Sequence, residues 1–110
     1  MPNLKIHADE ATLAARGAAL RAALPEIRAL ICAHLAVPPG ACQLAVVPVW
    51  GLEGQPPVNA ELSILPHPER TPERRRALAE ALQAKIAGAT ETQVALRLSL
   101  LDRETFIALK

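Results

Sequence analysis

The sequence predicts a two-layer α+β fold with four strands and two helices in the order β-α-β-β-α-β. Two long segments space their apolar residues as helices do, four short segments have the composition of strands, and the order divides into two similar βαβ units. Because parallel βαβ crossovers are nearly always right-handed, both helices should cover the same face of one four-stranded sheet. We expect the 110 residues to form a single domain, with βαβ units at 2–49 and 58–100 and a C-terminal segment at 101–110.

The first unit opens with a short strand and a long helix. Residues 2–7 alternate between apolar and polar side chains, which predicts a half-buried strand. From 12 to 36, leucine and isoleucine recur at helical spacing, which predicts an amphipathic helix. Pro25 lacks the amide hydrogen that a helix interior uses, so we expect a kink or a break there. The sequence VPPG at 37–40 ends this helix.

The second and third strands are separated by a loop rich in turn-forming residues. Residues 43–49 (QLAVVPV) are apolar on both faces, which predicts a central strand. Pro48 cannot donate a hydrogen bond to a neighbouring strand, so we place it near the end of that strand. The loop covers 51–57, and residues 58–65 alternate again as a strand.

The second helix has a clear start signal. Thr71 can accept a hydrogen bond from a first-turn amide, Pro72 has a φ angle suited to the first helical position, and Glu73 complements the helix dipole. We expect Gly88 to end this helix. The alternating segment 93–100 then forms the last strand.

The composition argues against several kinds of partner. Twelve basic and eleven acidic residues give a formal charge of +1, so we expect neither nucleic acid nor a membrane as a partner. No apolar run approaches the roughly 20 residues of a membrane-spanning helix. Because Trp50 and Phe106 are the only aromatic residues, the core must be built from small side chains, and burial between subunits would stabilise it. We therefore expect a homo-oligomer.

The cysteines and histidines bear on localisation and on metal binding. Cys32 and Cys42 are too few for a disulfide framework, and we interpret them as reduced residues of a cytoplasmic protein. The three histidines share no metal-ligand spacing with each other or with the cysteines, so we expect no metal site.

Pro2 follows the initiator Met1. A small second residue favours removal of the initiator, which would leave Pro2 as a secondary amine. Apolar surroundings disfavour the charged form of an amine and lower its pKa toward neutrality. Such an amine could take a proton from the carbon beside a carbonyl and return it to another carbon, which is a tautomerisation. The alternative interpretation of Pro2 is an inert terminus.

Several segments resemble the tautomerase superfamily, whose members begin with a catalytic proline and are built from βαβ units. The opening PNLKIH is similar to the family's first strand. Residues 37–48 (VPPGACQLAVVP) are similar to the matching segment of its macrophage migration inhibitory factors, and 70–74 (RTPER) to a helix start in its 4-oxalocrotonate tautomerases. The two fused units, with Val49 and Trp50, most resemble its 5-carboxymethyl-2-hydroxymuconate isomerases.

The resemblance implies an isomerase that needs no cofactor and interconverts the enol and keto forms of a small carboxylate, such as a 2-hydroxymuconate-type acid from the degradation of aromatic compounds. It implies Pro2 as the acid–base catalyst and Arg70 as a ligand of the substrate carboxylate. Arg97 would assist Arg70, and Phe106 and Trp50 would exclude water from the site. It also implies a homotrimer in which the uncovered sheet faces meet.

The sequence departs from the family pattern at the second substrate-binding arginine. The matching positions are Ala45 in the first unit and Ala95 in the second. Arg97 lies two residues after Ala95, on the same side of the strand, and can take the place of that arginine. The element order also fits ferredoxin-like domains, so a non-catalytic module that binds a small ligand is the alternative hypothesis.

Overall fold

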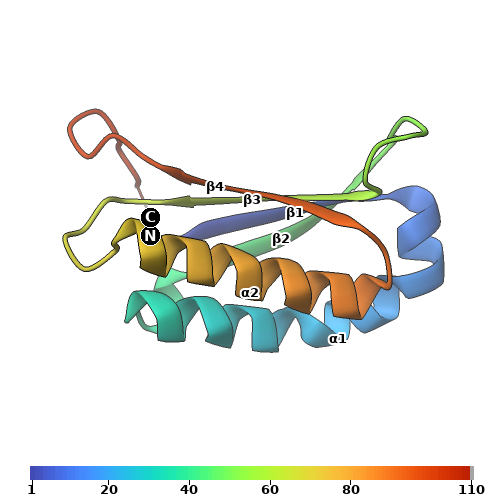
Figure 1. The fold of residues 1–110 in the computed structure, drawn as a ribbon, viewed down its shortest axis with the longest axis horizontal. Helices are drawn as coiled ribbons and strands as arrows, with labels where there is room; N and C mark the ends of the chain where they lie inside the picture. Colours follow the sequence, from blue (N-terminus) through green and yellow to red (C-terminus); the bar gives the residue numbers. More distant parts are fainter. Residues whose placement is uncertain (110) are drawn as a thin grey trace.

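A computed structural model describes residues 1–109 as one four-stranded sheet with both helices on the same face (Figure 1), which confirms the predicted fold class. The elements in chain order are β1 (Asn3–Asp9), α1 (Glu10–Leu35), the short 3-10 helix η1 (Pro39–Ala41), β2 (Gln43–Val49), β3 (Val58–Ile64), α2 (Pro72–Thr90) and β4 (Val94–Leu100).

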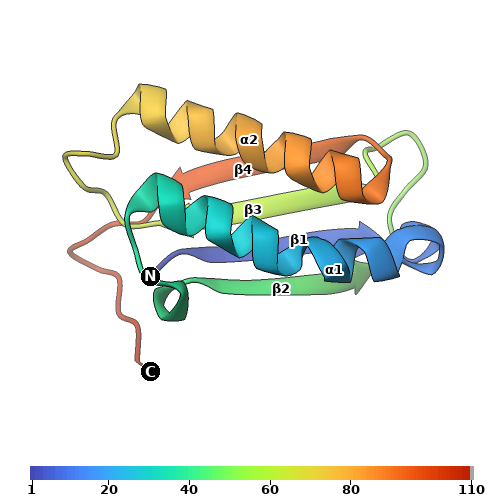
Figure 2. The same ribbon diagram turned by 90° about the horizontal axis from the view of Figure 1, so that it is seen from below.

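The sheet topology gathers the ends of different strands at one edge of the molecule. The strand order is β2-β1-β3-β4; β1 is parallel to β2 and antiparallel to β3, and β3 is parallel to β4. The first residues of β1 and β2 therefore lie beside the last residues of β3 and β4. We call this side of the sheet the amino end, and the register places Asn3, Gln43, Ser63 and Ser99 there. The β2–β3 loop lies at the opposite end (Figure 2).

β2 is an edge strand, so its predicted central position is wrong. Leu44 and Val46 pack against the core, whereas Ala45 and Val47 lie on the face that no helix covers within residues 1–109. An edge strand also tolerates Pro48, because no further strand needs its missing amide hydrogen. The apolar residues of β2 therefore have two different surroundings. One set packs under the helices, and no helix of residues 1–109 covers the other set.

The core lies between the sheet and the two helices. Alternate residues of the two central strands face the helices and are completely buried: Leu4, Ile6, Ala8, Val58, Ala60, Leu62 and Ile64. The helices supply the other half of this core with Leu20, Ile27, Ile31, Leu78, Leu82 and Ile86. Burial of each leucine, isoleucine or valine side chain in this core contributes about 1.5–3 kcal/mol, so this layer holds the helices on the sheet.

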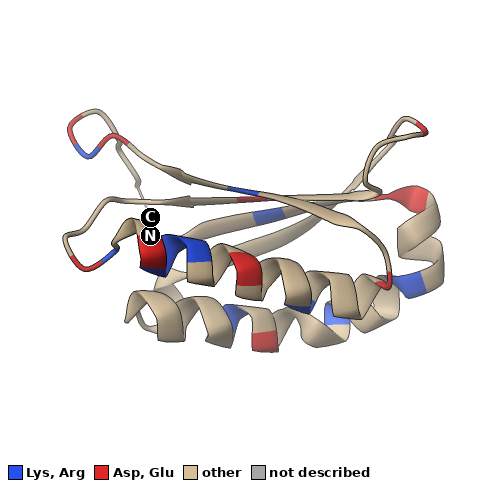
Figure 3. Cartoon of the chain, viewed as in Figure 1, with Lys and Arg blue, Asp and Glu red and all other residues tan. Residues whose placement is uncertain are grey.

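The intervening strand residues form what we call the open face of the sheet. It comprises Asn3, Lys5, His7, Gln43, Ala45, Val47, Asn59, Glu61, Ser63, Ala95, Arg97 and Ser99. In its middle, Lys5, Glu61 and Arg97 lie side by side on β1, β3 and β4 and give alternating charges across the sheet (Figure 3). A partner covering this face would meet charges at its centre and apolar residues along β2.

α1 is one continuous helix of 26 residues, so of the two outcomes predicted at Pro25, a kink or a break, the break is absent. Pro25 is exposed on this helix, as is Arg21, whose carbonyl group loses its helical partner. Water can satisfy that carbonyl, so the helix continues past the proline. The helix also begins earlier than predicted, at Glu10.

The start of α2 is as predicted, but its end is not. The Thr71 side chain accepts a hydrogen bond from the Arg74 amide at 3.3 Å. The helix continues beyond Gly88 to Thr90, because Glu91 adopts the left-handed conformation at φ 54° and donates its amide to the carbonyl four residues earlier. A non-glycine residue therefore closes this helix.

We expect Pro25→Ala to raise the free energy of unfolding by about 1–3 kcal/mol, because alanine restores a helical hydrogen bond and favours the helix. Chemical denaturation followed by circular dichroism measures this change. Ala29→Ser, at another exposed position of α1, should change stability by less than about 0.5 kcal/mol. A less stable Pro25→Ala protein would contradict the assignment of Pro25 as a tolerated defect.

Candidate functional site

A cavity of about 510 Å³ lies at the amino end of the sheet. Its lining residues are Met1, Asn3, Gln43, Ser63, Leu101, Phe106, Ala108 and Leu109. One wall is therefore polar and carried by strands, and the other is apolar and carried by the C-terminal segment. A volume of this size suits a small organic molecule.

The C-terminal segment is held beside this cavity by backbone hydrogen bonds. The Leu101 amide donates to the Ile64 carbonyl at 2.8 Å, which extends the pairing of β4 with β3. A turn follows, in which the Phe106 amide donates to the Asp102 carbonyl at 2.9 Å. Arg103 donates to the Pro66 carbonyl across the same end of the molecule. These contacts hold Phe106 at the cavity that Met1 also lines.

Pro2 is buried directly before β1. Its carbonyl accepts a hydrogen bond from the Gln43 amide at 2.9 Å, which joins the beginnings of β1 and β2. Its nitrogen forms the peptide bond to Met1, and Met1 lines the cavity. The nitrogen therefore lies one residue from the cavity and has no basicity while Met1 is attached.

Arg70 lies at the same end of the sheet but borders a different hollow. Its Nη1 donates to the Leu65 carbonyl at 2.7 Å, and it lines a space of about 240 Å³ together with His34, His67 and Arg74. It is not among the residues that line the cavity beside Met1. The guanidinium carries further N–H donors, which remain for a ligand.

Arg97 and Trp50 lie away from the amino end within one chain. Arg97 projects from the middle of the open face, with its Nη1 3.6 Å from Glu61 Oε1. This exposed pair is weak, so it leaves the arginine available. Trp50 follows β2 at the opposite end of the sheet and is 89% exposed. β2 is seven residues long, so about 20 Å separate Trp50 from the start of the strand.

The structure thus places Phe106 and Met1 at one cavity, with Arg70 at the same end of the sheet. Arg97 and Trp50 lie away from this end. Asn3, Gln43 and Ser63 also line the cavity, and sequence reasoning did not select them as site residues. The signal for Asn3 was present, since it alternates with buried residues in the first strand. That Gln43 and Ser63 lie beside Asn3 follows from the strand order. Local sequence patterns carry no information on the strand order.

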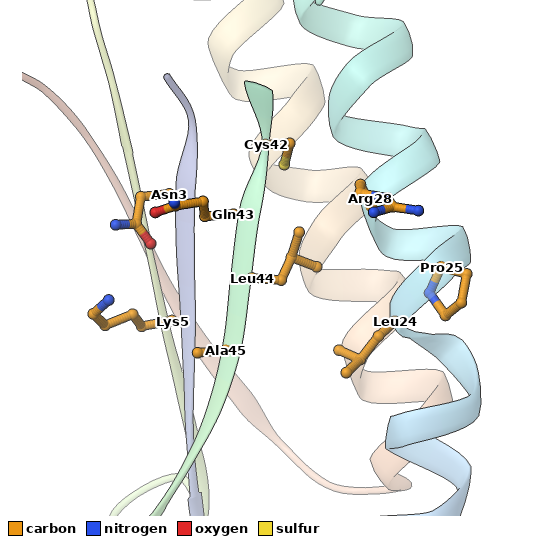
Figure 4. A pocket seen from close by; sticks show the side chains of 9 residues that line it. All are labelled: Asn3, Lys5, Leu24, Pro25, Arg28, Cys42, Gln43, Leu44 and Ala45. Atoms are coloured by element: carbon orange, nitrogen blue, oxygen red, sulfur yellow. The ribbon is translucent and has the colours of Figure 1, made fainter. Parts of the chain in front are cut away.

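A second hollow of about 580 Å³ lies along the free edge of β2. Figure 4 shows that its lining comes from both sides of the strand: Asn3, Lys5 and Gln43 lie away from α1, whereas Cys42 and Leu44 point toward it. The strand divides this hollow, so it is an exposed sheet edge and not one enclosed site.

The described part of the chain holds neither a metal cluster nor a membrane-spanning helix. Among residues 1–109, no three histidine, cysteine or carboxylate side chains gather as metal ligands. Neither helix there combines the length and the apolarity that crossing a membrane requires.

Cys42, beside the amino end, has a distinctive thiol. Burial, followed by the neighbouring Cys32 thiol, raises the pKa of Cys42 from 9.0 to about 11. Both cysteines are free. At neutral pH the Cys42 thiol therefore stays protonated and unreactive.

We expect iodoacetamide at pH 8 to alkylate the partly exposed Cys32 faster than Cys42 in the folded protein, as measured by peptide mass spectrometry. Because the unfolded chain loses this proton first, the free energy of unfolding should fall as pH rises from 9.0 toward about 11. The Cys42→Ala variant should lack this part of the decline. Equal alkylation rates at the two sites would contradict the assignment.

No protein-family model and no curated protein matches this sequence. Solved structures do match. The F6 fused 4-OT, a wild-type asymmetric trimer, is 16% identical with a TM-score of 0.73, over 96% of this chain and 91% of that one. A macrophage migration inhibitory factor-like protein from Entamoeba histolytica is 11% identical with a TM-score of 0.67, over 97% and 94%. N1, a member of the cis-3-chloroacrylic acid dehalogenase family, is 14% identical with a TM-score of 0.68, over 96% and 79%. The chain therefore has the fold that these three proteins share.

Proposed function

We propose that the protein is a tautomerase-superfamily isomerase that needs no cofactor and uses Pro2 as its acid–base catalyst. The observation that carries this proposal is the position of Met1, which lines the amino-end cavity directly before Pro2. Removal of Met1 would leave the Pro2 secondary amine next to that cavity. The shared fold of fused 4-OT, a migration inhibitory factor-like protein and a dehalogenase-family member supports the proposal.

The surroundings of Pro2 suit a neutral amine. Pro2 itself is buried, and Leu101 and Phe106 supply apolar wall to the adjacent cavity. Desolvation disfavours the ammonium form, so a free Pro2 would hold an unshared electron pair near neutral pH. The amine would take a proton from the enol hydroxyl, or from the carbon beside a carbonyl in an unsaturated ketone, and return it to a different carbon of the same molecule.

The proposed substrate is a small carboxylate of the 2-hydroxymuconate type, handled in the cytoplasm. Arg70 and Arg97 are the proposed carboxylate ligands, because a guanidinium offers a planar pair of donors that matches a carboxylate. Arg70 uses one donor on the Leu65 carbonyl, which orients the group at the amino end. Arg97 would act from the open face, where it is only loosely paired.

A homotrimer would complete this arrangement. Trp50 lies at the far end of its own sheet and 89% exposed, so it can contribute to a Pro2 site only from another copy. Ala45 and Val47 on the open face of β2, together with the exposed Leu109, also leave apolar surface for neighbours to cover. The F6 fused 4-OT, which has the same fold, is a trimer.

Intact mass should show loss of Met1 from the protein expressed in cells, and the protein should convert the enol form of 2-hydroxymuconate to its keto form in an ultraviolet assay. Pro2→Ala should lower kcat/KM at least about 100-fold, because the general base is lost. Pro48→Ala, at an exposed proline of the far end, is the matched control and should keep its rate. Equal rates for wild type and Pro2→Ala would reject the catalytic proposal and favour the ferredoxin-like binding module.

Light scattering should give three times the 11.7 kDa mass of one chain. Trp50→Ala should leave this mass unchanged but lower kcat/KM about tenfold, because the neighbouring copy loses part of its apolar wall. A dimer would contradict the trimer. Wild-type kinetics in Trp50→Ala would remove Trp50 from the site.

A further inference from the structure

Three polar side chains form a row across neighbouring strands at the amino end. Asn3 of β1 pairs in register with Gln43 of β2 on one side and with Ser63 of β3 on the other. Facing residues of paired strands stand about 5 Å apart, so the three side chains lie within reach of one small ligand group. Figure 4 shows the Asn3 and Gln43 side chains together on the side of β2 away from α1.

These side chains are free to bind a ligand. Across residues 1–109, no hydrogen bond joins the Asn3, Gln43 or Ser63 side chain to another protein group. Asn59 Oδ1 is the one buried side-chain polar atom in that range without a partner, so the polar atoms of the row are accessible. The two carboxamides carry two N–H donors each, and the hydroxyl carries one O–H.

The other residues that line the cavity indicate which ligand group can accept hydrogen bonds from these three side chains. The rest of the lining is apolar, with Leu101, Phe106 and Leu109, and among residues 1–109 no charged side chain lines the cavity. Neutral donors facing an apolar wall suit a ketone or enol oxygen on a hydrocarbon skeleton. The carboxylate of the proposed substrate would be bound separately, by the arginines that lie outside this cavity.

We propose that Asn3, Gln43 and Ser63 bind the ketone or enol oxygen of the reactant, with its carbon skeleton against the apolar wall. This assignment rests on the proposed catalytic role of Pro2. The reactant carries a C=C bond next to the carbon that Pro2 deprotonates. When Pro2 takes that proton, the electron pair of the C–H bond forms a new C=C bond and the carbonyl π pair moves onto oxygen, which gives a dienolate whose far carbon can accept the proton. The row then donates to the enolate oxygen until Pro2 returns the proton to another carbon and the C=O bond re-forms. Donors already in place for developing charge are an effective form of catalysis.

A matched pair of ligands tests the row without relying on turnover. Phenylpyruvate and 3-phenylpropanoate share a ring and a carboxylate, and only the first carries a ketone. Wild-type protein should bind phenylpyruvate more tightly by calorimetry, and its binding should shift the side-chain amide NMR signals of Asn3 and Gln43. Asn3→Ala and Ser63→Ala should each reduce the preference for the ketone about threefold to tenfold.

The controls separate this role from a structural one. Ser63→Thr keeps the hydroxyl, so this variant should retain the wild-type preference for the ketone ligand. Ser99→Ala removes a hydroxyl from the same register row on β4, outside the cavity, and should leave it unchanged. Equal weakening of both ligands by Asn3→Ala and Ser63→Ala, or a wild-type protein with no preference for the ketone, would overturn the proposal. A preserved preference with equal turnover of wild type and Pro2→Ala would instead reject Pro2 catalysis and retain the oxygen-binding row.

Discussion

The position of β1 between β2 and β3 constrains the rest of the molecule. Its inward residues, Leu4, Ile6 and Ala8, are completely buried under the helices, so its outward residues must form the open face. A shift of one residue would exchange the two sets and expose the core. The same strand is antiparallel to β3, which brings the segment after Pro2 beside the end of β3. The amino-end cavity is a direct result of this pairing.

The loop before α2 shows how backbone groups can orient charge. Arg70, Arg74 and Arg75 each donate to the carbonyl five residues earlier in the chain. These contacts tie the loop to the first turn of the helix and use only part of each guanidinium. The arginines are therefore oriented before any ligand arrives, which lowers the entropy lost on binding.

Local patterns predicted the elements and the face of the sheet that the helices cover, because the spacing of apolar residues in a strand or helix follows which of its faces is buried. They failed at β2, because apolar residues on both faces look the same whether a second helix or a neighbouring chain is the cover. They failed at Gly88, because the left-handed conformation of Glu91 depends on the chain that follows. Family resemblance, and not a local pattern, predicted Pro2 and Phe106 as site residues; Phe106 and Met1 line the same cavity. The row of Asn3, Gln43 and Ser63 could not be predicted locally, because it exists only through the strand order.

The two outer strands of the sheet have a consequence for assembly. Within the part of the chain that the structure describes, β2 and β4 each have only one neighbouring strand, and they are different surfaces. Contact between β2 of one copy and β4 of the next is therefore heterologous, and such a contact either closes into a ring or continues as a filament. Pro48 removes one backbone donor from β2 and shortens the stretch that can template another strand. For copies that associate through these edges, the angle between successive copies would decide the outcome, since ring closure consumes every free edge and an open helix always leaves two.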